Sequence, residues 1–167
     1  MTDQRKEFSK IYDKYIDKIY RFIYLKVSSE DIAKDICSET FLKGWVAFQS
    51  AEEKIENPSA FLYRIARNLV TDHYRQRGRT QFVSIENNPI IDQVQGVEER
   101  MMAVSEIEQI KAILPNLKED YQNVIIWRYL DDLSVSEIAK ILDRSEQTTR
   151  VLLHRALKSL KGELEQV

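Results

Sequence analysis

The scarcity of helix-breaking residues constrains the fold of this chain more than any other feature. Only four glycines and three prolines occur in 167 residues. Apolar residues recur every three to four positions over most of the sequence, whereas the alternation typical of strands is scarce. We therefore expect an all-α protein, and a hydrophobic content of 43% is enough to form real cores.

The apolar stripes predict a series of helices. The first covers residues 3 to 26, and Ser28-Ser29 interrupts it and caps a second helix that ends near Phe48. The expected apolar side of that second helix consists of Ile32, Ile36, Phe41, Leu42 and Trp45. Asn57 and Pro58 then start a long third helix, up to residue 79. Further helices are expected over residues 98–114 and 116–129, separated by Pro115.

The loss of helical spacing after residue 79 predicts a linker. Residues 79–97 include Asn87-Asn88-Pro89 and Gly96 and show no convincing helical stripe. Residues 80–103 carry one cation and four anions. Since nearly twenty residues without structure are unusual inside one compact domain, we expect two small helical domains, residues 1–79 and 104–167, joined by a flexible acidic linker over residues 80–103.

Residues 133–164 predict two helices joined by a tight turn. Ser134 stands three positions before Glu137, which is the spacing of a capping box. Asp143-Arg144 forms the turn, and Ser145 caps a second helix whose expected inward side consists of Thr149, Leu153, Ala156, Leu157 and Leu160. Between residues 144 and 161 five cations accompany one anion. This charge favours a helix-turn-helix on DNA, although a hairpin used only for packing has the same apolar spacing.

A second basic segment covers residues 57–79. Five arginines accompany one acid, Asp72, and the aromatic residues Phe61, Tyr63, His73 and Tyr74 lie among them. Rings can stack on unpaired bases, worth about 1–3 kcal/mol per base, while arginines hold the backbone. A solvated basic face on an amphipathic helix explains the same pattern equally well. Taken alone, this segment leaves both interpretations open.

Other classes of protein lack support in the sequence. His73 follows Asp72 directly, but adjacent helical positions point in different directions and no further His or Cys lies close, so we expect no metal site, no cofactor and no enzyme. The single cysteine, Cys37, excludes an intrachain disulfide and is best explained as a small buried residue. The start is charged and no apolar run approaches about 18 residues, so we expect a soluble, intracellular protein.

Taken together, these motifs resemble bacterial sigma factors of the extracytoplasmic-function group, which have only the second and fourth sigma domains. Residues 33–45 resemble the family segment A-x-D-L-x-Q-E-x-F-L-x-x-W, and residues 61–75 resemble the helix W-L-Y-R-I-A-R-N-x-x-x-D-x-x-R. The C-terminal match runs from Leu114-Pro115 through Arg128-Tyr129 and Glu137-Ile138-Ala139 to residues 154–157. The resemblance covers nearly the whole chain.

The resemblance implies three sets of functional residues. Docking on the clamp helices of the polymerase β′ subunit is implied for Asp35, Ser38, Glu39, Phe41, Leu42 and Trp45. Binding of the minus-ten element is implied for Arg64, Arg67, Asn68, Asp72, Tyr74, Arg75 and Arg77. Binding of the minus-thirty-five element is implied for Arg144, Ser145, Gln147, Thr148, Arg150, Val151, His154, Arg155 and Lys158. Within these sets we expect Asn68, Asp72 and Arg75 to set minus-ten specificity, and Gln147, Thr148, Arg150 and Val151 to face base edges.

The same resemblance implies the partners. They are core RNA polymerase, through its β′ clamp helices and β flap, promoter DNA, and an anti-sigma factor, with no small-molecule substrate. The implied location is cytoplasmic, without insertion into a membrane. The acidic linker is expected to thread the polymerase cleft toward the RNA exit path, because it mimics a polyanion.

Some positions depart from the family pattern. Ser38 replaces a frequent glutamine, Phe61 the usual tryptophan, and Asp143 a common glycine at the turn. Leu152 stands where a cation often contacts DNA, and Thr149 where a buried valine is usual. The last two positions leave promoter preference and local packing open.

Two other functions fit the residues less completely. A free-standing regulator would use the same helix-turn-helix on an operator, with the N-terminal helices forming a dimer or sensing a ligand, and would bind DNA tightly without polymerase. An interaction module would place both basic faces against acidic proteins, but this alternative leaves the helix-turn-helix unexplained.

Overall fold

The computed structural model describes residues 2–51, 55–80 and 108–165. All regular secondary structure in these ranges is helical, which confirms the predicted all-α fold. The chain divides into two compact units: the first contains the residues up to Thr80, and the second contains most of the residues after it, so the helices after residue 107 are described with the second unit. The predicted linker, residues 80–103, lies outside the described residues apart from its first position, so its limits stay a prediction.

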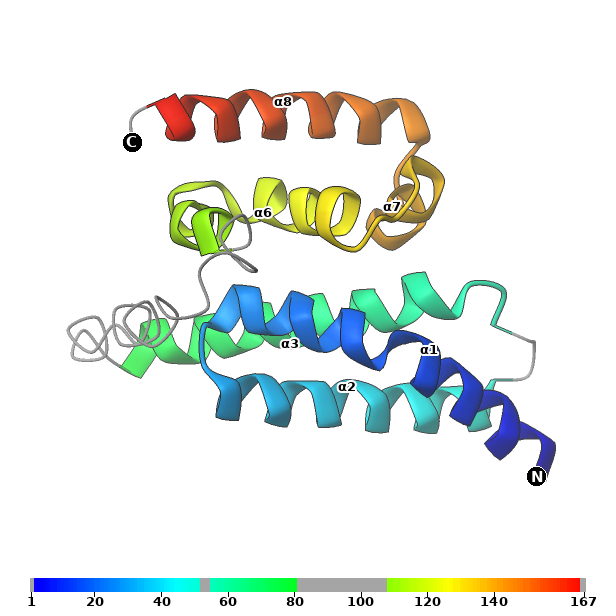
Figure 1. Cartoon of the computed structure of the whole chain (residues 1–167). Helices are drawn as coiled ribbons and strands as arrows, with labels where there is room; N and C mark the ends of the chain where they lie inside the picture. The colour runs from blue at the N-terminus through cyan, green and yellow to red at the C-terminus, as the bar shows by residue number, and fades with distance from the viewer. Residues whose placement is uncertain (1, 52–54, 81–107, 166–167) are drawn as a thin grey trace. The chain divides into compact units, whose positions relative to one another are not determined.

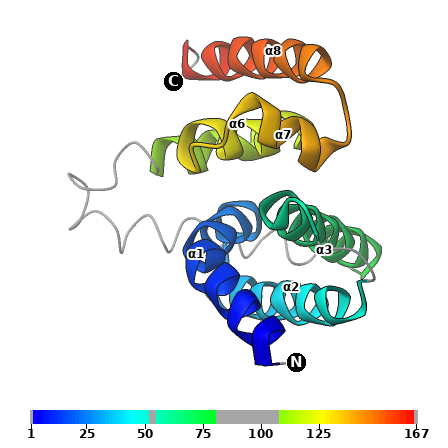
Figure 2. The same ribbon diagram turned by 90° about the vertical axis from the view of Figure 1, so that its right-hand side faces the viewer.

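The first unit consists of three helices, α1 (Thr2–Val27), α2 (Glu30–Ser50) and α3 (Pro58–Thr80), each of which contacts the other two (Figures 1 and 2). Their apolar stripes meet in one core, to which fully buried side chains such as Phe22 each contribute about 1.5–3 kcal/mol. The core includes Ile19, Phe22, Ile23, Ala33, Ile36, Phe41, Leu62, Tyr63, Ala66 and Val70. Helices α2 and α3 approach closely at Gly44, where a Cβ atom would lie 2.8 Å from Leu62 Cδ2.

The helix ends in this unit follow the local sequence signals. Ser28 adopts a left-handed φ of 58° between α1 and α2, and Ser29 caps α2 by accepting from the Ile32 N–H at 3.4 Å. Asn57 Oδ1 accepts from the Ala60 N–H at 3.1 Å. The predicted interruption at Ser28-Ser29 and the predicted cap at Asn57 are therefore confirmed, while α2 continues to Ser50 and shortens the expected loop.

The second unit begins, within the described residues, with a helix over residues 108–113. A 3-10 turn (Leu114–Asn116), α6 (Glu119–Ile125), a π-helical turn (Ile126–Leu130), α7 (Val135–Leu142) and α8 (Glu146–Glu165) follow. Helices α6 and α8 lie side by side in Figures 1 and 2. The buried residues include Leu114, Val124, Ile125, Ile126, Trp127, Ile138, Ile141, Leu153 and Ala156.

The helix predicted over residues 116–129 begins later than expected, and its last turn is π-helical and ends at Leu130. After Pro115 the Leu117 N–H donates to the Leu114 carbonyl at 2.9 Å, and Leu117 itself is extended, so α6 starts only at Glu119. At the other end the backbone widens at Ile126 into a π-helical turn. That turn closes where the Asp131 N–H donates to the Ile126 carbonyl at 2.9 Å.

Candidate functional site

Helices α7 and α8 form the predicted helix-turn-helix. Ser134 Oγ accepts from the Glu137 N–H at 3.1 Å, and Glu137 Oε1 accepts from the Ser134 N–H at 3.3 Å, so the predicted capping box is present. At the turn Asp143 has a φ of 55°, and the Arg144 N–H donates to the Ala139 carbonyl at 3.0 Å. This is a Schellman end, and aspartate adopts its left-handed position more readily than most residues other than glycine. Asp143 therefore performs the turn that glycine commonly makes.

The start of α8 is capped and internally bonded. Ser145 Oγ accepts from the Thr148 N–H at 3.1 Å, which confirms the predicted cap. Thr149 is fully buried, and its hydroxyl donates to the Ser145 carbonyl at 2.9 Å. Because the buried hydroxyl has a partner, threonine fits a position where valine is usual, and the question of local packing is resolved.

One side of α8 packs on the unit and the rest is open to solvent. Leu153 and Ala156 are buried as predicted, and Leu160 is partly buried. Leu157 is 39% exposed, so its predicted inward position is wrong. The packed side of the helix includes Leu153, Ala156 and Leu160. Leu157 lies at the edge of this side, where it is open to solvent.

The residues predicted to contact the minus-thirty-five element all lie on the open side of α8 or at its start. All nine are exposed: Arg144, Ser145, Gln147, Thr148, Arg150, Val151, His154, Arg155 and Lys158. Arg150 also lies 3.6 Å from Glu146 Oε1, with both side chains more than half exposed. A surface pair of this kind contributes only a few tenths of a kcal/mol, so Arg150 can leave it for another acceptor.

The aromatic residues of α3 are less available than the sequence predicts. Tyr63 is 0% exposed and packs edge-on against Phe22, with ring centroids 5.9 Å apart. Tyr63 therefore lies on the core side of the helix, and its ring cannot stack on a base while the unit is folded. Tyr74 is 42% exposed, but its hydroxyl donates to the Lys26 carbonyl of α1. Phe61 and His73 are partly buried.

Polar residues form a continuous exposed line along α3. Arg64, Asn68, Asp72 and Arg75 are exposed and follow one another at spacings of four, four and three residues, so they share one face of the helix. Arg67 and Arg77 are partly exposed beside them. Burial, followed by the nearby Arg77 guanidinium, lowers the pKa of His73 below its ordinary value.

The predicted polymerase contacts on α2 divide between surface and core. Asp35, Ser38, Glu39 and Leu42 are exposed and Trp45 is partly exposed. Phe41 is only 5% exposed and packs against Tyr12 and Phe8 of α1, at centroid distances of 4.8 Å and 6.5 Å. Phe41 therefore supports this face from beneath and does not form part of its surface.

An apolar pair stands out on the same face of α2. Leu42 is 62% exposed, and Val46, one turn later, is 53% exposed. Of the residues expected along one apolar side of α2, Ile36 and Phe41 are buried whereas Leu42 is open to solvent. Sequence reasoning missed Val46, although its spacing of four residues from Leu42 was a usable signal. Glu39 and Lys43 pair beside them at 3.6 Å.

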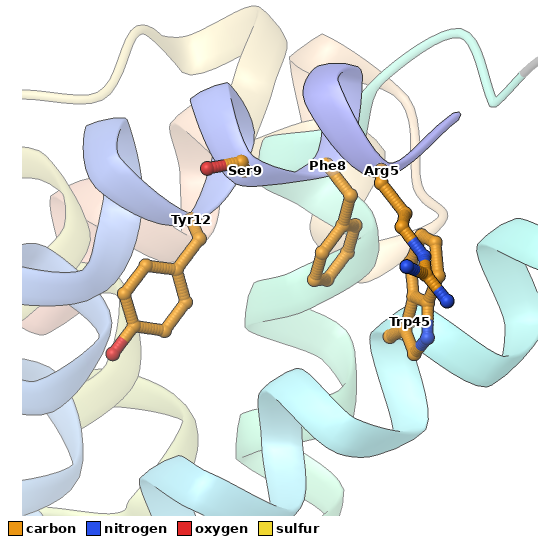
Figure 3. Close-up of a pocket in the computed structure, with 5 residues that line it drawn as sticks. All are labelled: Arg5, Phe8, Ser9, Tyr12 and Trp45. Atoms are coloured by element: carbon orange, nitrogen blue, oxygen red, sulfur yellow. The ribbon is translucent and has the colours of Figure 1, made fainter. Parts of the chain in front are cut away.

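An open groove borders this face. It has a volume of about 400 Å³ and is lined by Arg5, Phe8, Ser9 and Tyr12 of α1 and by Trp45 of α2 (Figure 3). The Phe8 and Trp45 rings lie 5.3 Å apart. Trp45 therefore belongs both to the groove and to the predicted polymerase contacts, which the sequence did not indicate.

Cys37 is buried, and burial raises the pKa of its thiol to about 11. Among residues 2–51, 55–80 and 108–165, no group of three His, Cys, Asp or Glu side chains is arranged to hold a metal ion. Within the same ranges no helix has the length and apolar character needed to cross a membrane.

Two family models match the chain. Residues 11–80 match Sigma-70 region 2, and residues 107–160 match Sigma-70, region 4. The two matches fall on the two units and include α3 and the helix-turn-helix respectively. The chain therefore belongs to the sigma-70 family of RNA polymerase sigma factors, and within it to the extracytoplasmic-function group.

Individual relatives agree with this assignment. The extracytoplasmic-function sigma factor BldN of Streptomyces coelicolor is 29% identical over 92% of this chain, which spans 58% of BldN. SigW of Bacillus subtilis, of the same group, is 29% identical over 94% of this chain and 88% of its own length. The sigma factor RpoE in complex with the anti-sigma factor NepR from Bartonella quintana shares the fold, with a TM-score of 0.68, 22% identity, and coverage of 96% and 98%.

Proposed function

We propose that this chain is an alternative sigma factor that binds core RNA polymerase and directs promoter recognition, strand opening and transcription initiation. The observation that carries the proposal is the presence of both region 2 and region 4 in one chain, each on its own unit. A free-standing regulator needs only the second of these. The chain itself carries out no bond chemistry, and it acts where RNA polymerase acts, in the cytoplasm.

The polymerase contact is assigned to the open face of α2. Asp35, Ser38 and Glu39 supply polar groups, and the exposed pair Leu42 and Val46 supplies apolar area. Two adjacent aliphatic side chains on a polar helix gain stability when a partner covers them, because apolar area removed from water is worth about 25 cal/mol per Å². The β′ clamp helices are the proposed partner here, and the β flap is proposed for the second unit.

Promoter contacts are assigned to the two basic helices. The exposed line of α3 from Arg64 through Asn68 and Asp72 to Arg75 is proposed to hold the minus-ten strand. The exposed residues of α8 are proposed to enter the major groove of the minus-thirty-five element, with Gln147, Thr148, Arg150 and Val151 at base edges. Arg155 and Lys158 are then left to contact phosphates.

An anti-sigma factor is the proposed inhibitor. RpoE of Bartonella quintana, which shares this fold, was solved with the anti-sigma factor NepR. The exposed face of α2 assigned to polymerase and the exposed basic sides of α3 and α8 assigned to the promoter are the surfaces that such a partner would cover. We propose that occupation of these faces and binding of polymerase exclude each other.

Pull-down of purified core RNA polymerase tests the proposal, followed by run-off transcription on fragmented genomic DNA of the host. We expect the chain to retain the core enzyme and to produce promoter-dependent transcripts. Leu42→Glu and Val46→Glu should each weaken polymerase retention at least tenfold, because a charge would be buried in the contact. Leu164→Glu changes another exposed leucine, on α8, and should leave retention by the clamp unchanged.

Two results would contradict these proposals. Sequence-specific DNA retention by the chain alone, with no retention of core polymerase, would contradict the proposal and favour the free-standing regulator. Retention unaffected by both substitutions on α2 would contradict the assignment of the docking face alone.

A further inference from the structure

Val151 is an apolar residue in the middle of the open polar side of α8. It is 46% exposed, and Gln147 and Arg155, one turn before and one turn after it, are exposed as well. The buried line of the helix, which includes Leu153 and Ala156, lies on the other side. Single exposed valines are common on protein surfaces, so the exposure alone indicates no function. The position among residues assigned to DNA is the informative feature.

The chemistry of valine at this position is specific. Valine is a poorer helix former than alanine, so an exposed helical site gains no local stability from it. Its branched side chain is held in essentially one rotamer in a helix, which fixes its two methyl groups in space. A rigid apolar group makes no favourable contact with a phosphate. In the major groove, the matching apolar group is the C5 methyl of thymine.

We propose that Val151 determines specificity by packing its methyl groups against the C5 methyl of one thymine in the upstream promoter element. This inference rests on the proposed function, because it requires α8 to lie in the major groove. Gln147, one turn earlier on the same side, can form paired hydrogen bonds with an adenine, so the two side chains would read neighbouring base pairs. The recognition helix would then favour A·T pairs at this step.

The test removes the thymine C5 methyl from the DNA and, separately, the two methyl groups of Val151 from the protein. A promoter recovered by run-off transcription is prepared with each upstream-element thymine replaced, one at a time, by deoxyuridine, which lacks only the C5 methyl. Binding of these duplexes is measured with polymerase holoenzyme formed from the wild-type chain and from Val151→Ala. Leu164→Ala is the matched control, because Leu164 has the same 46% exposure on the same helix but lies near its C-terminal end.

We expect one thymine at which deoxyuridine weakens binding by wild-type holoenzyme about fourfold, the value of one buried methyl group. Holoenzyme with Val151→Ala should bind this duplex and the thymine duplex equally well, whereas Leu164→Ala should behave as wild type. Sensitivity retained in Val151→Ala, no sensitive thymine at all, or an element without thymine would overturn the inference while leaving the proposed function intact. If holoenzyme with the wild-type chain recognises no promoter, the proposed function fails, and the inference fails with it.

Discussion

The two basic segments, residues 57–79 with most of α3 and residues 144–161 with most of α8, each carry five cations and one acid. Their structural use differs. On α3 the Tyr63 ring is buried in the core and the Tyr74 hydroxyl is bonded to α1, so part of the aromatic and polar face stabilises its own unit. On α8 all nine predicted contact residues, including the cap and turn positions before it, are exposed.

This difference shows that charged and aromatic residues in a sequence indicate a binding surface only when their side chains are known to be exposed. The open part of α3 includes the line Arg64, Asn68, Asp72 and Arg75, with Tyr74 and Gln76 exposed beside it. The open part of α8 is a broad side with a buried apolar stripe beneath it. We infer that only part of the basic and aromatic side of α3 is available to nucleic acid, whereas the whole outward side of α8 is available.

The largest expected effect tests the buried part of α3. Tyr63→Ala should lower the free energy of unfolding of the first unit by about 3–5 kcal/mol, because it removes a fully buried ring. Urea unfolding of the full chain, followed by circular dichroism, measures this loss. Tyr63→Phe, which keeps the ring, should retain most of the stability. Unchanged stability of Tyr63→Ala with a selective loss of opened-strand binding would instead make this ring a base platform.

The next effect tests the open side of α8. Arg150→Ala should reduce promoter discrimination about tenfold, because a base contact by arginine is worth about 1–3 kcal/mol. Transcription from matched and mutated promoters measures the change. Lys161→Ala removes the same charge from the same helix and should lower binding uniformly across sequences. Unaltered promoter preference in Arg150→Ala would show that the assignment of the recognition helix is wrong.

A smaller loss of stability is expected when the cap at the start of either helix is removed. Asn57 caps α3 and Ser145 caps α8, each through a side-chain oxygen that lies 3.1 Å from a backbone nitrogen. Asn57→Ala and Ser145→Ala should each cost about 1 kcal/mol, in the first and second unit respectively. Denaturant unfolding monitored by amide hydrogen exchange resolves the two units. A loss in the wrong unit, or no loss, would contradict the cap assignments.

The smallest effect is the pH dependence that His73 adds to α3. The folded state lowers the pKa of His73, so the unfolded chain binds this proton more tightly. The stabilising contribution of neutral His73 is therefore complete above its ordinary pKa, 6.5, and declines as the pH falls toward the folded-state pKa. His73→Gln should show a flatter decline of the urea midpoint between pH 7 and pH 5 than wild type. Identical slopes would contradict the burial of this imidazole.

Local signals in the sequence predicted the helix starts well. The Ser134–Glu137 capping box, the Ser145 and Asn57 caps and the Ser28-Ser29 interruption depend on neighbours within a few residues, and all are present. Predictions that depend on how helices pack were less accurate. Tyr63 belongs to the core and Leu42 to the surface because the partners of α2 and α3 decide which side of each helix is covered.

Two features required the backbone geometry itself. The π-helical turn at Ile126–Leu130 leaves the apolar spacing readable as an ordinary helix, so the sequence carries no signal for it. The groove at Trp45 needs side chains from α1 and α2 together. The roles of individual residues in polymerase and promoter binding follow from the family resemblance and from exposure, and they stay predictions.

Promoter binding with and without core polymerase distinguishes a sigma factor from a free-standing regulator. Fluorescence anisotropy of a labelled promoter duplex, recovered by run-off transcription, is measured with the chain alone, with core enzyme alone and with both. We expect sequence-specific binding only when both proteins are present, because the two units contact the promoter as part of the holoenzyme. Tight, sequence-specific binding by the chain alone, unchanged by core enzyme, would contradict this expectation.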